Sequence, residues 1–114
     1  MMEFHQGEIV MVQFPYDDLT DSKMRPALVL AKSWHSAYLV AAITSQTKYA
    51  KSGAIEIKAS DLKAGTMRLK SNILPTVLFT AKHSIIRSVV GELNLEAYRK
   101  ATTIVCKLLI PQEI

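Results

Sequence analysis

Hydrophobic and polar residues alternate in several short segments of this chain. Alternation predicts β-strands, because successive side chains of a strand point to opposite faces of a sheet. The segments with this pattern are 8–14, 53–59 and 65–74, and apolar runs predict two further strands over 25–32 and 37–46. In 25–32 the apolar run is nearly continuous, which predicts a strand buried on both faces. In 53–59 we expect Ile55 and Ile57 to face the core and Glu56 to face solvent.

The segment 65–74 is predicted to be a single strand with two unlike faces. One face would carry Met67, Leu69 and Ser71. The other face would carry Thr66, Arg68 and Lys70. Farther along, 76–86 and 87–93 predict either two short strands or one strand and a helical turn. Between the first two strands, the sequence PYDDLTDSKM (15–24) has a proline and three aspartates, which predicts an exposed loop.

The last segment, 94–110, changes from strand to helical spacing. Asn94 is placed to cap the helix N-terminus. The predicted buried face of the helix carries Leu95, Tyr98, Thr102, Val105 and Leu108. Several short strands followed by one C-terminal helix predict a mainly β protein of the α+β class, a small and mostly antiparallel barrel with helical additions.

Size and composition predict an ordinary folded domain. The chain has 114 residues, enough for one domain spanning 1–114, and 49% of them are hydrophobic. Its apolar runs are far shorter than the ~20 residues that cross a membrane, and the first residues do not resemble a secretion signal. Its only cysteine and its three scattered histidines predict no disulfide, no metal site and no cofactor. We therefore expect a cytoplasmic protein.

Charge is distributed unevenly along the chain. Residues 1–22 carry five acids and no Lys or Arg, whereas 23–87 carry eleven Lys or Arg and two acids, Glu56 and Asp61. Residues 88–114 carry three charges of each sign, which gives a net charge of +4. A basic middle suits a polyanionic partner such as nucleic acid. A solubilising surface is the alternative.

Arg25 is the first candidate for chemistry. Pro26 pushes the backbone of Arg25 into extended geometry. We expect Pro26 at the first residue of its strand, where no ladder hydrogen bond is lost. The guanidinium would then lie at a rigid rim and could bind a phosphate through two parallel hydrogen bonds. Alternatively, it pairs with an aspartate of the preceding loop.

The run after the third strand, ITSQT, is the second candidate. The hydroxyls of Thr44 and Ser45 could donate hydrogen bonds to phosphate oxygens, or they could bond to their own backbone in a turn. His83 lies near the end of a strand, where it is either a general base or an ordinary solvated histidine.

Taken together, these residues resemble the MazF/PemK family of toxin endoribonucleases from bacterial toxin-antitoxin modules. The resemblance rests on GEIVMVQFPYDDLTDSKMRPALVL, then AAITSQ, LKSNIL and SIIRSVVGEL before a terminal helix. It covers nearly the whole chain, and its most specific part is the opening block with Arg25 and Pro26.

The resemblance implies an SH3-like β-barrel that forms a homodimer with a groove for single-stranded RNA. It also implies metal-independent cleavage, in which the ribose 2′-hydroxyl attacks the adjacent phosphate and leaves 2′,3′-cyclic phosphate and 5′-hydroxyl ends. Arg25 and Thr44 match the family's catalytic positions. The implied RNA-binding residues are Ser45, Gln46, Ser71, Lys70, Arg68 and Asp18. The implied partner is a cognate antitoxin with an acidic, flexible tail.

One stretch departs from the family. Where many members carry an acidic residue followed by Gln or Lys, this chain has Thr76, Val77 and Leu78. Two alternative functions therefore stay open: a CcdB-like gyrase poison, which shares this barrel, and a barrel that binds RNA or protein without cleaving it.

Overall fold

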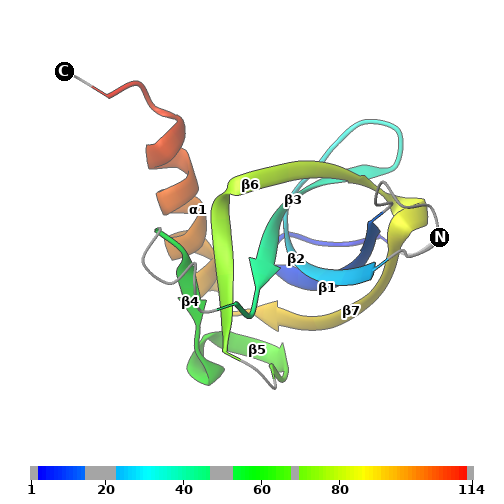
Figure 1. Cartoon of the computed structure of the whole chain (residues 1–114), viewed down its shortest axis with the longest axis horizontal. Helices are drawn as coiled ribbons and strands as arrows, with labels where there is room; N and C mark the ends of the chain where they lie inside the picture. Colours follow the sequence, from blue (N-terminus) through cyan, green and yellow to red (C-terminus); the bar gives the residue numbers. More distant parts are fainter. Residues whose placement is uncertain (1–2, 15–22, 47–52, 68–69, 113–114) are drawn as a thin grey trace.

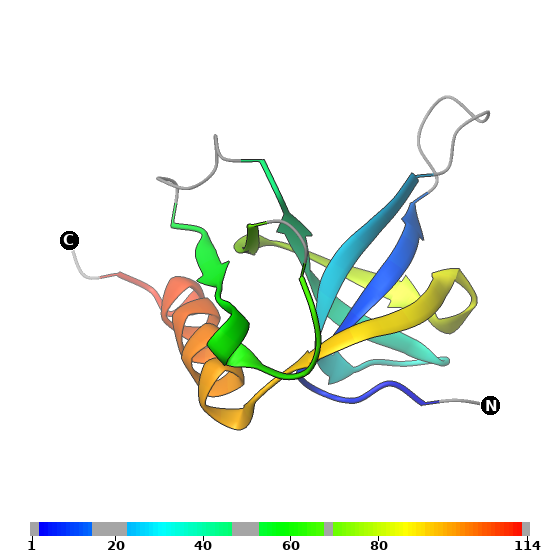
Figure 2. The ribbon, with the colours of Figure 1, turned by 90° about the horizontal axis from the view of Figure 1, so that it is seen from below.

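The computed structural model describes residues 3–14, 23–46, 53–67 and 70–112. Within them, seven strands form one antiparallel sheet in the order β4-β6-β3-β2-β1-β7-β5. The strands are β1 (Glu8–Phe14), β2 (Lys23–Lys32), β3 (Ala37–Thr44), β4 (Ile55–Ile57), β5 (Leu62–Gly65), β6 (Ser71–Lys82) and β7 (Ile86–Leu93). The sheet curls into a half-barrel, and the helix α1 (Leu95–Leu109) lies outside the curl (Figure 1; Figure 2). The predicted fold class is confirmed.

The central strands bury both of their faces. An inner core inside the curl contains Val10, Val12, Ala27, Val29 and Val40. An outer core lies between the sheet and α1, with Ile9, Leu28, Ile43, Ile73 and Ala101. Adjacent residues such as Leu28 and Val29 are both fully buried. Burial on both faces of β2 explains why the run of apolar residues in 25–32 is nearly continuous.

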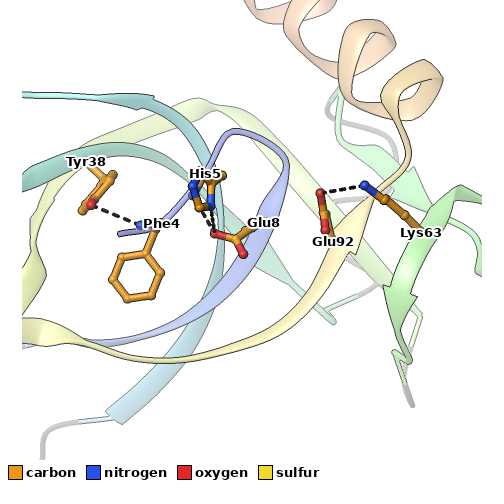
Figure 3. Close-up of polar contacts among 6 residues, drawn as sticks. All are labelled: Phe4, His5, Glu8, Tyr38, Lys63 and Glu92. Carbon is orange, nitrogen blue, oxygen red and sulfur yellow. Dashed lines mark hydrogen bonds and ion pairs between the residues drawn. The ribbon is translucent and has the colours of Figure 1, made fainter. Parts of the chain in front are cut away.

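An N-terminal segment completes the inner core. Phe4 is buried, and its backbone N–H donates to the hydroxyl of Tyr38 at 3.2 Å (Figure 3). The two rings meet edge to face with their centroids 5.4 Å apart. His83, in the 3₁₀ turn η3 (His83–Ile85), lies against the same phenylalanine at 5.1 Å between ring centroids. The segment therefore fills one end of the curl with aromatic side chains.

β6 has a sharp corner, which Figure 1 shows as a bend in its ribbon. Its pairing with β3 moves from Ala41↔Leu78 to Ile43↔Ile73, so two residues of β3 oppose five of β6. A bulge of this kind bends a strand and tolerates proline, and Pro75 is buried there. The stretch that departs from the family pattern therefore forms a structural corner.

The C-terminal helix is close to the prediction. The side chain of Asn94 accepts a hydrogen bond from the Ala97 N–H at 2.8 Å, so the predicted N-cap is confirmed. The predicted buried face is partly wrong, because Leu95 and Leu108 are exposed. The residues that face the outer core are Ala97, Tyr98 and Ala101, with Val105 also buried. Small alanines allow the helix to approach the sheet closely.

Tyr98 ties the helix to the sheet. Its hydroxyl donates to the carbonyl oxygen of Leu30 at 2.7 Å. Burial raises the pKa of Tyr98, which favours the protonated form that this hydrogen bond requires. No helix in the described part of the chain is long and apolar enough to cross a membrane.

Two expectations about strand positions are wrong. The predicted strand 65–74 is divided, because β5 ends at Gly65 with φ +81° and β6 begins at Ser71. A 3₁₀ turn, η2 (Ala59–Asp61), also precedes β5. Pro26 is not the first residue of its strand, because β2 begins at Lys23. Proline is tolerated there because β3 pairs with β2 only from Ala27 onward, so this end of β2 pairs on one side only.

Candidate functional site

A groove of about 520 Å³ lies where the ends of several strands meet, and we call it the Arg25 groove. Its polar lining consists of Arg25, Thr44, Ser45, Gln46, Thr66 and Ser71. Its apolar lining consists of Met11, Met24, Pro26, Ile43, Met67 and Val90. Five of the residues predicted from the sequence are therefore brought together: Arg25, Thr44, Ser45, Gln46 and Ser71.

The strand register explains why these residues converge. Arg25 pairs with Val12 on β1, and β2 pairs with β3 as far as Ala27↔Ala42. Two residues beyond that pair, each strand carries a candidate, Arg25 on β2 and Thr44 on β3. Thr44 in turn pairs with Asn72 on β6, one residue from Ser71. Three neighbouring strands thus present their candidate residues at one end of the sheet.

The hydroxyl of Thr44 bonds to the nearby backbone in a turn, which was one of the two interpretations of ITSQT. Its Oγ1 accepts a hydrogen bond from the backbone N–H of Gln46 at 3.1 Å. This bond uses an acceptor site of the hydroxyl, whereas a threonine hydroxyl also has a hydrogen to donate. Turn and ligand binding are therefore compatible, because the turn directs Thr44 while leaving its O–H as a donor.

Lys70 lies outside the Arg25 groove. It lines an adjoining hollow of about 480 Å³, which we call the Lys70 hollow, together with Glu56. Its Nζ lies 3.7 Å from the Glu56 carboxylate, in an ion pair near the surface. The two depressions share Thr66 and Met67 in their walls. Lys70 is therefore next to the groove and not within it.

The remaining candidates have other outcomes. Arg68 and Asp18 fall outside the described residues, as does most of the loop 15–24. His83 packs against Phe4 and Tyr38, at the opposite end of β6 from Ser71. Thr76, Val77 and Leu78 form the β6 corner and do not line the groove. Among the described residues, no group of three or more His, Cys, Asp or Glu side chains could hold a metal ion.

Sequence patterns missed part of the groove wall. Thr66 and Met67 were assigned to opposite faces of a strand, yet both line the groove. They follow Gly65, the last residue of β5, where a positive φ turns the chain out of the strand direction. A Cβ at Gly65 would lie 2.3 Å from the carbonyl oxygen of Val90. Glycine here lets β5 approach β7 closely, and an isolated glycine at the end of a strand pattern was the available signal.

The groove combines one guanidinium, several hydroxyls and an apolar floor. A guanidinium and hydroxyl donors suit a phosphate, and an apolar floor suits a nucleobase or an apolar side chain. Fold and groove together define a small, curled half-barrel with a polar rim at its strand ends. A family model described as the PemK-like, MazF-like toxin of type II toxin-antitoxin systems matches residues 5–109. The chain belongs to this family.

Solved structures share the fold at low sequence identity. The MazE-MazF structure from Deinococcus radiodurans is 17% identical with a TM-score of 0.72, covering 90% of this chain and 92% of that one. A mycobacterial endoribonuclease in complex with its cognate antitoxin is 13% identical with a TM-score of 0.68, covering 95% of both chains. The Mycobacterium tuberculosis toxin MazF-mt6 is 15% identical with a TM-score of 0.68, covering 90% and 95%. No curated protein matches the chain significantly.

Proposed function

We propose that this protein is the toxin of a toxin-antitoxin module and cleaves single-stranded RNA without a metal ion. In the proposed reaction a ribose 2′-hydroxyl attacks the adjacent phosphate, and the products carry 2′,3′-cyclic phosphate and 5′-hydroxyl ends. The observation that carries the proposal is the convergence of Arg25, Thr44 and Ser71 on one groove.

The proposed roles follow from the chemistry of each side chain. Arg25 stabilises the negative charge that develops on the phosphorane, because its guanidinium stays protonated and can donate two parallel hydrogen bonds. Thr44 holds a phosphate oxygen through its O–H while the turn to Gln46 fixes its position. Ser45, Gln46 and Ser71 contact neighbouring parts of the RNA. Lys70 binds a phosphate farther along the strand.

An RNA cleavage assay tests this function. Purified protein is incubated in EDTA with a panel of long single-stranded RNAs of varied sequence, and the product ends are identified by mass spectrometry. We expect cleavage at a limited set of sequences, with cyclic-phosphate ends. Intact RNA across the whole panel would contradict the proposal and favour a binding protein or a CcdB-like poison.

A partner antitoxin is proposed on the basis of charge. Residues 23–87 carry nine more positive than negative charges, and one fold relative is a complex of an endoribonuclease with its cognate antitoxin. An acidic, flexible tail bound over Arg25 would lose affinity as salt screens the charges. We expect the affinity for an acidic antitoxin-tail peptide to fall at least tenfold between about 0.05 and 0.5 M salt. A flat response would count against an electrostatic contact.

The homodimer that the family implies stays a prediction. Large apolar side chains are exposed on the described surface, including Leu108, Leu109 and Ile110 at the end of α1. Such residues are common at subunit interfaces. Sedimentation equilibrium should give twice the 12.7 kDa mass of the chain, and a monomer at micromolar concentration would refute the dimer.

A further inference from the structure

The proposed reaction requires a group that accepts a proton, and none of the described residues that line the Arg25 groove is such a group. Attack by the 2′-hydroxyl releases its hydrogen as a proton. Arg25 is permanently protonated, and the other polar groups that the described residues contribute to the groove are hydroxyls and an amide, which are poor bases at neutral pH. The following inference rests on the proposed function and concerns the missing base.

The histidines do not supply this base. His5 lies in the N-terminal segment before β1, His35 in the turn between β2 and β3, and His83 in η3. None of the three lines the Arg25 groove or the Lys70 hollow. Among the described carboxylates, Glu56 is the one in the wall of the hollow that adjoins the groove.

The sheet register places Glu56 in line with Thr44. On one side of β6, Asn72 pairs with Thr44 of β3, and on the other side it pairs with Glu56 of β4. Neighbouring strands are about 4.8 Å apart, so the Cα atoms of Thr44 and Glu56 are separated by about 10 Å. That separation leaves room for one ribose between a phosphate at Thr44 and the carboxylate.

These three side chains project to the same side of the sheet. Their neighbours Ile43, Ile73 and Ile57 all belong to the outer core. Because side chains alternate along each strand, Thr44, Asn72 and Glu56 point the opposite way. Arg25 points the same way, since Ala27, two residues on, belongs to the inner core. A polar row thus runs across four strands, Glu56, Asn72, Thr44 and Arg25.

The residues of this row differ in solvent exposure. Asn72 is buried, with 6% of its surface exposed, whereas the side chain of Glu56 is 41% exposed. Asn72 lies between Thr44 and Glu56 in the row, and it lines neither the groove nor the hollow.

We propose that Glu56 is the general base of the cleavage reaction. The Glu56 carboxylate takes the proton of the 2′-hydroxyl as the O2′–P bond forms. The P–O5′ bond then breaks, and the departing 5′ oxygen takes a proton from water. Glu56 loses its proton to solvent and is ready for another cycle. The Lys70 Nζ lies 3.7 Å from this carboxylate and places a positive charge beside it.

Other charged groups surround the proposed base. Lys58 and Asp61 from the segment after β4, and Lys100 from α1, line a small cavity together with Glu56. These residues and Lys70 would influence any pH dependence, so the test compares variants at matched pH and salt. Its readout is the shape of the pH profile, which a purely structural residue would not change.

The test measures kcat/KM for a cleaved RNA between pH 4.5 and 9 in the wild type and in Glu56→Gln. We expect the substitution to lower kcat/KM at pH 7.5 by about 10²-fold or more and to remove the decrease at acid pH. The matched control is Glu92→Gln, because Glu92 lies 3.8 Å from Lys63 in a similar ion pair away from the groove (Figure 3). This control should keep the wild-type profile.

A second variant distinguishes the loss of a base from misfolding. In Glu56→Ala, added acetate or formate should restore part of the lost rate, and the equivalent Glu92→Ala should show no such rescue. If Glu56→Gln cleaves at the wild-type rate with the acid limb intact, Glu56 is not the base, and the proposed function still stands. If the wild type cleaves no RNA at all, the proposed function and this inference both fail.

Discussion

Replacing Arg25 with alanine is expected to lower kcat/KM for RNA cleavage by about 10²–10³-fold, because the substitution removes a guanidinium that lines the groove. The expected loss is in kcat more than in KM, since the charge that Arg25 neutralises is largest in the transition state. Single-turnover cleavage of a short RNA with one cut site measures it. Arg25→Lys should recover part of the activity, because it keeps the charge without the two parallel donors.

A second arginine provides the control for Arg25. Arg87 is exposed on β7 and donates from Nε to the Gln13 side chain at 2.8 Å. Arg87→Ala removes the same charge from a surface outside the groove, so we expect a change of no more than about threefold, from weaker long-range attraction of RNA. Equal losses for both variants would mean that Arg25 contributes only to the overall positive charge.

Replacing Gly65 with alanine is expected to destabilise the fold by about 2 kcal/mol or more and to weaken RNA binding. Two physical effects add. The backbone of Gly65 has φ +81°, which disfavours residues with a side chain, and the new Cβ would lie 2.3 Å from the Val90 carbonyl oxygen. β5 must then move away from β7, and Thr66 and Met67 in the groove wall move with it. Urea unfolding and RNA affinity measure the two consequences.

A substitution at Gly53 separates the backbone effect from the steric effect of the new Cβ. It has nearly the same backbone angle, φ +84°, but a Cβ there would meet nothing within 4 Å. Gly53→Ala should therefore cost only the backbone term, about 1 kcal/mol, and leave RNA affinity unchanged. If the two alanine variants were equally stable, the close approach of β5 and β7 would not matter to the fold.

Many of the strands and the helix could be predicted because they depend on residues that are close in sequence. Alternation in 53–59 identified β4, and helical spacing after Asn94 identified α1 together with its cap. The boundaries were less predictable where tertiary contacts decide them. No single strand covers 65–74, because β5 ends at Gly65 and β6 begins at Ser71. The close approach of Gly65 to Val90 depends on β7, which is distant in sequence.

The buried face of α1 shows the same limit. Helical spacing selected Leu95 and Leu108 for the core, but both are exposed. The sheet contacts only the stripe around Ala97 and Ala101, because the helix crosses the sheet at one place. Periodicity shows that a helix has an apolar side, but it does not show which part of that side another element covers.

By itself, the sequence determined that this chain forms a strand-rich fold with one terminal helix, and it predicted Arg25 and Thr44 as catalytic residues and Ser71 as an RNA contact. Those conclusions rest on period, turn chemistry and motif resemblance, which are properties of neighbouring residues. The tertiary structure alone decided that Thr66 and Met67 join the groove and that Glu56, Asn72 and Thr44 form one row. The register of β4 and β3 against β6 sets that row, and register depends on how the whole sheet packs.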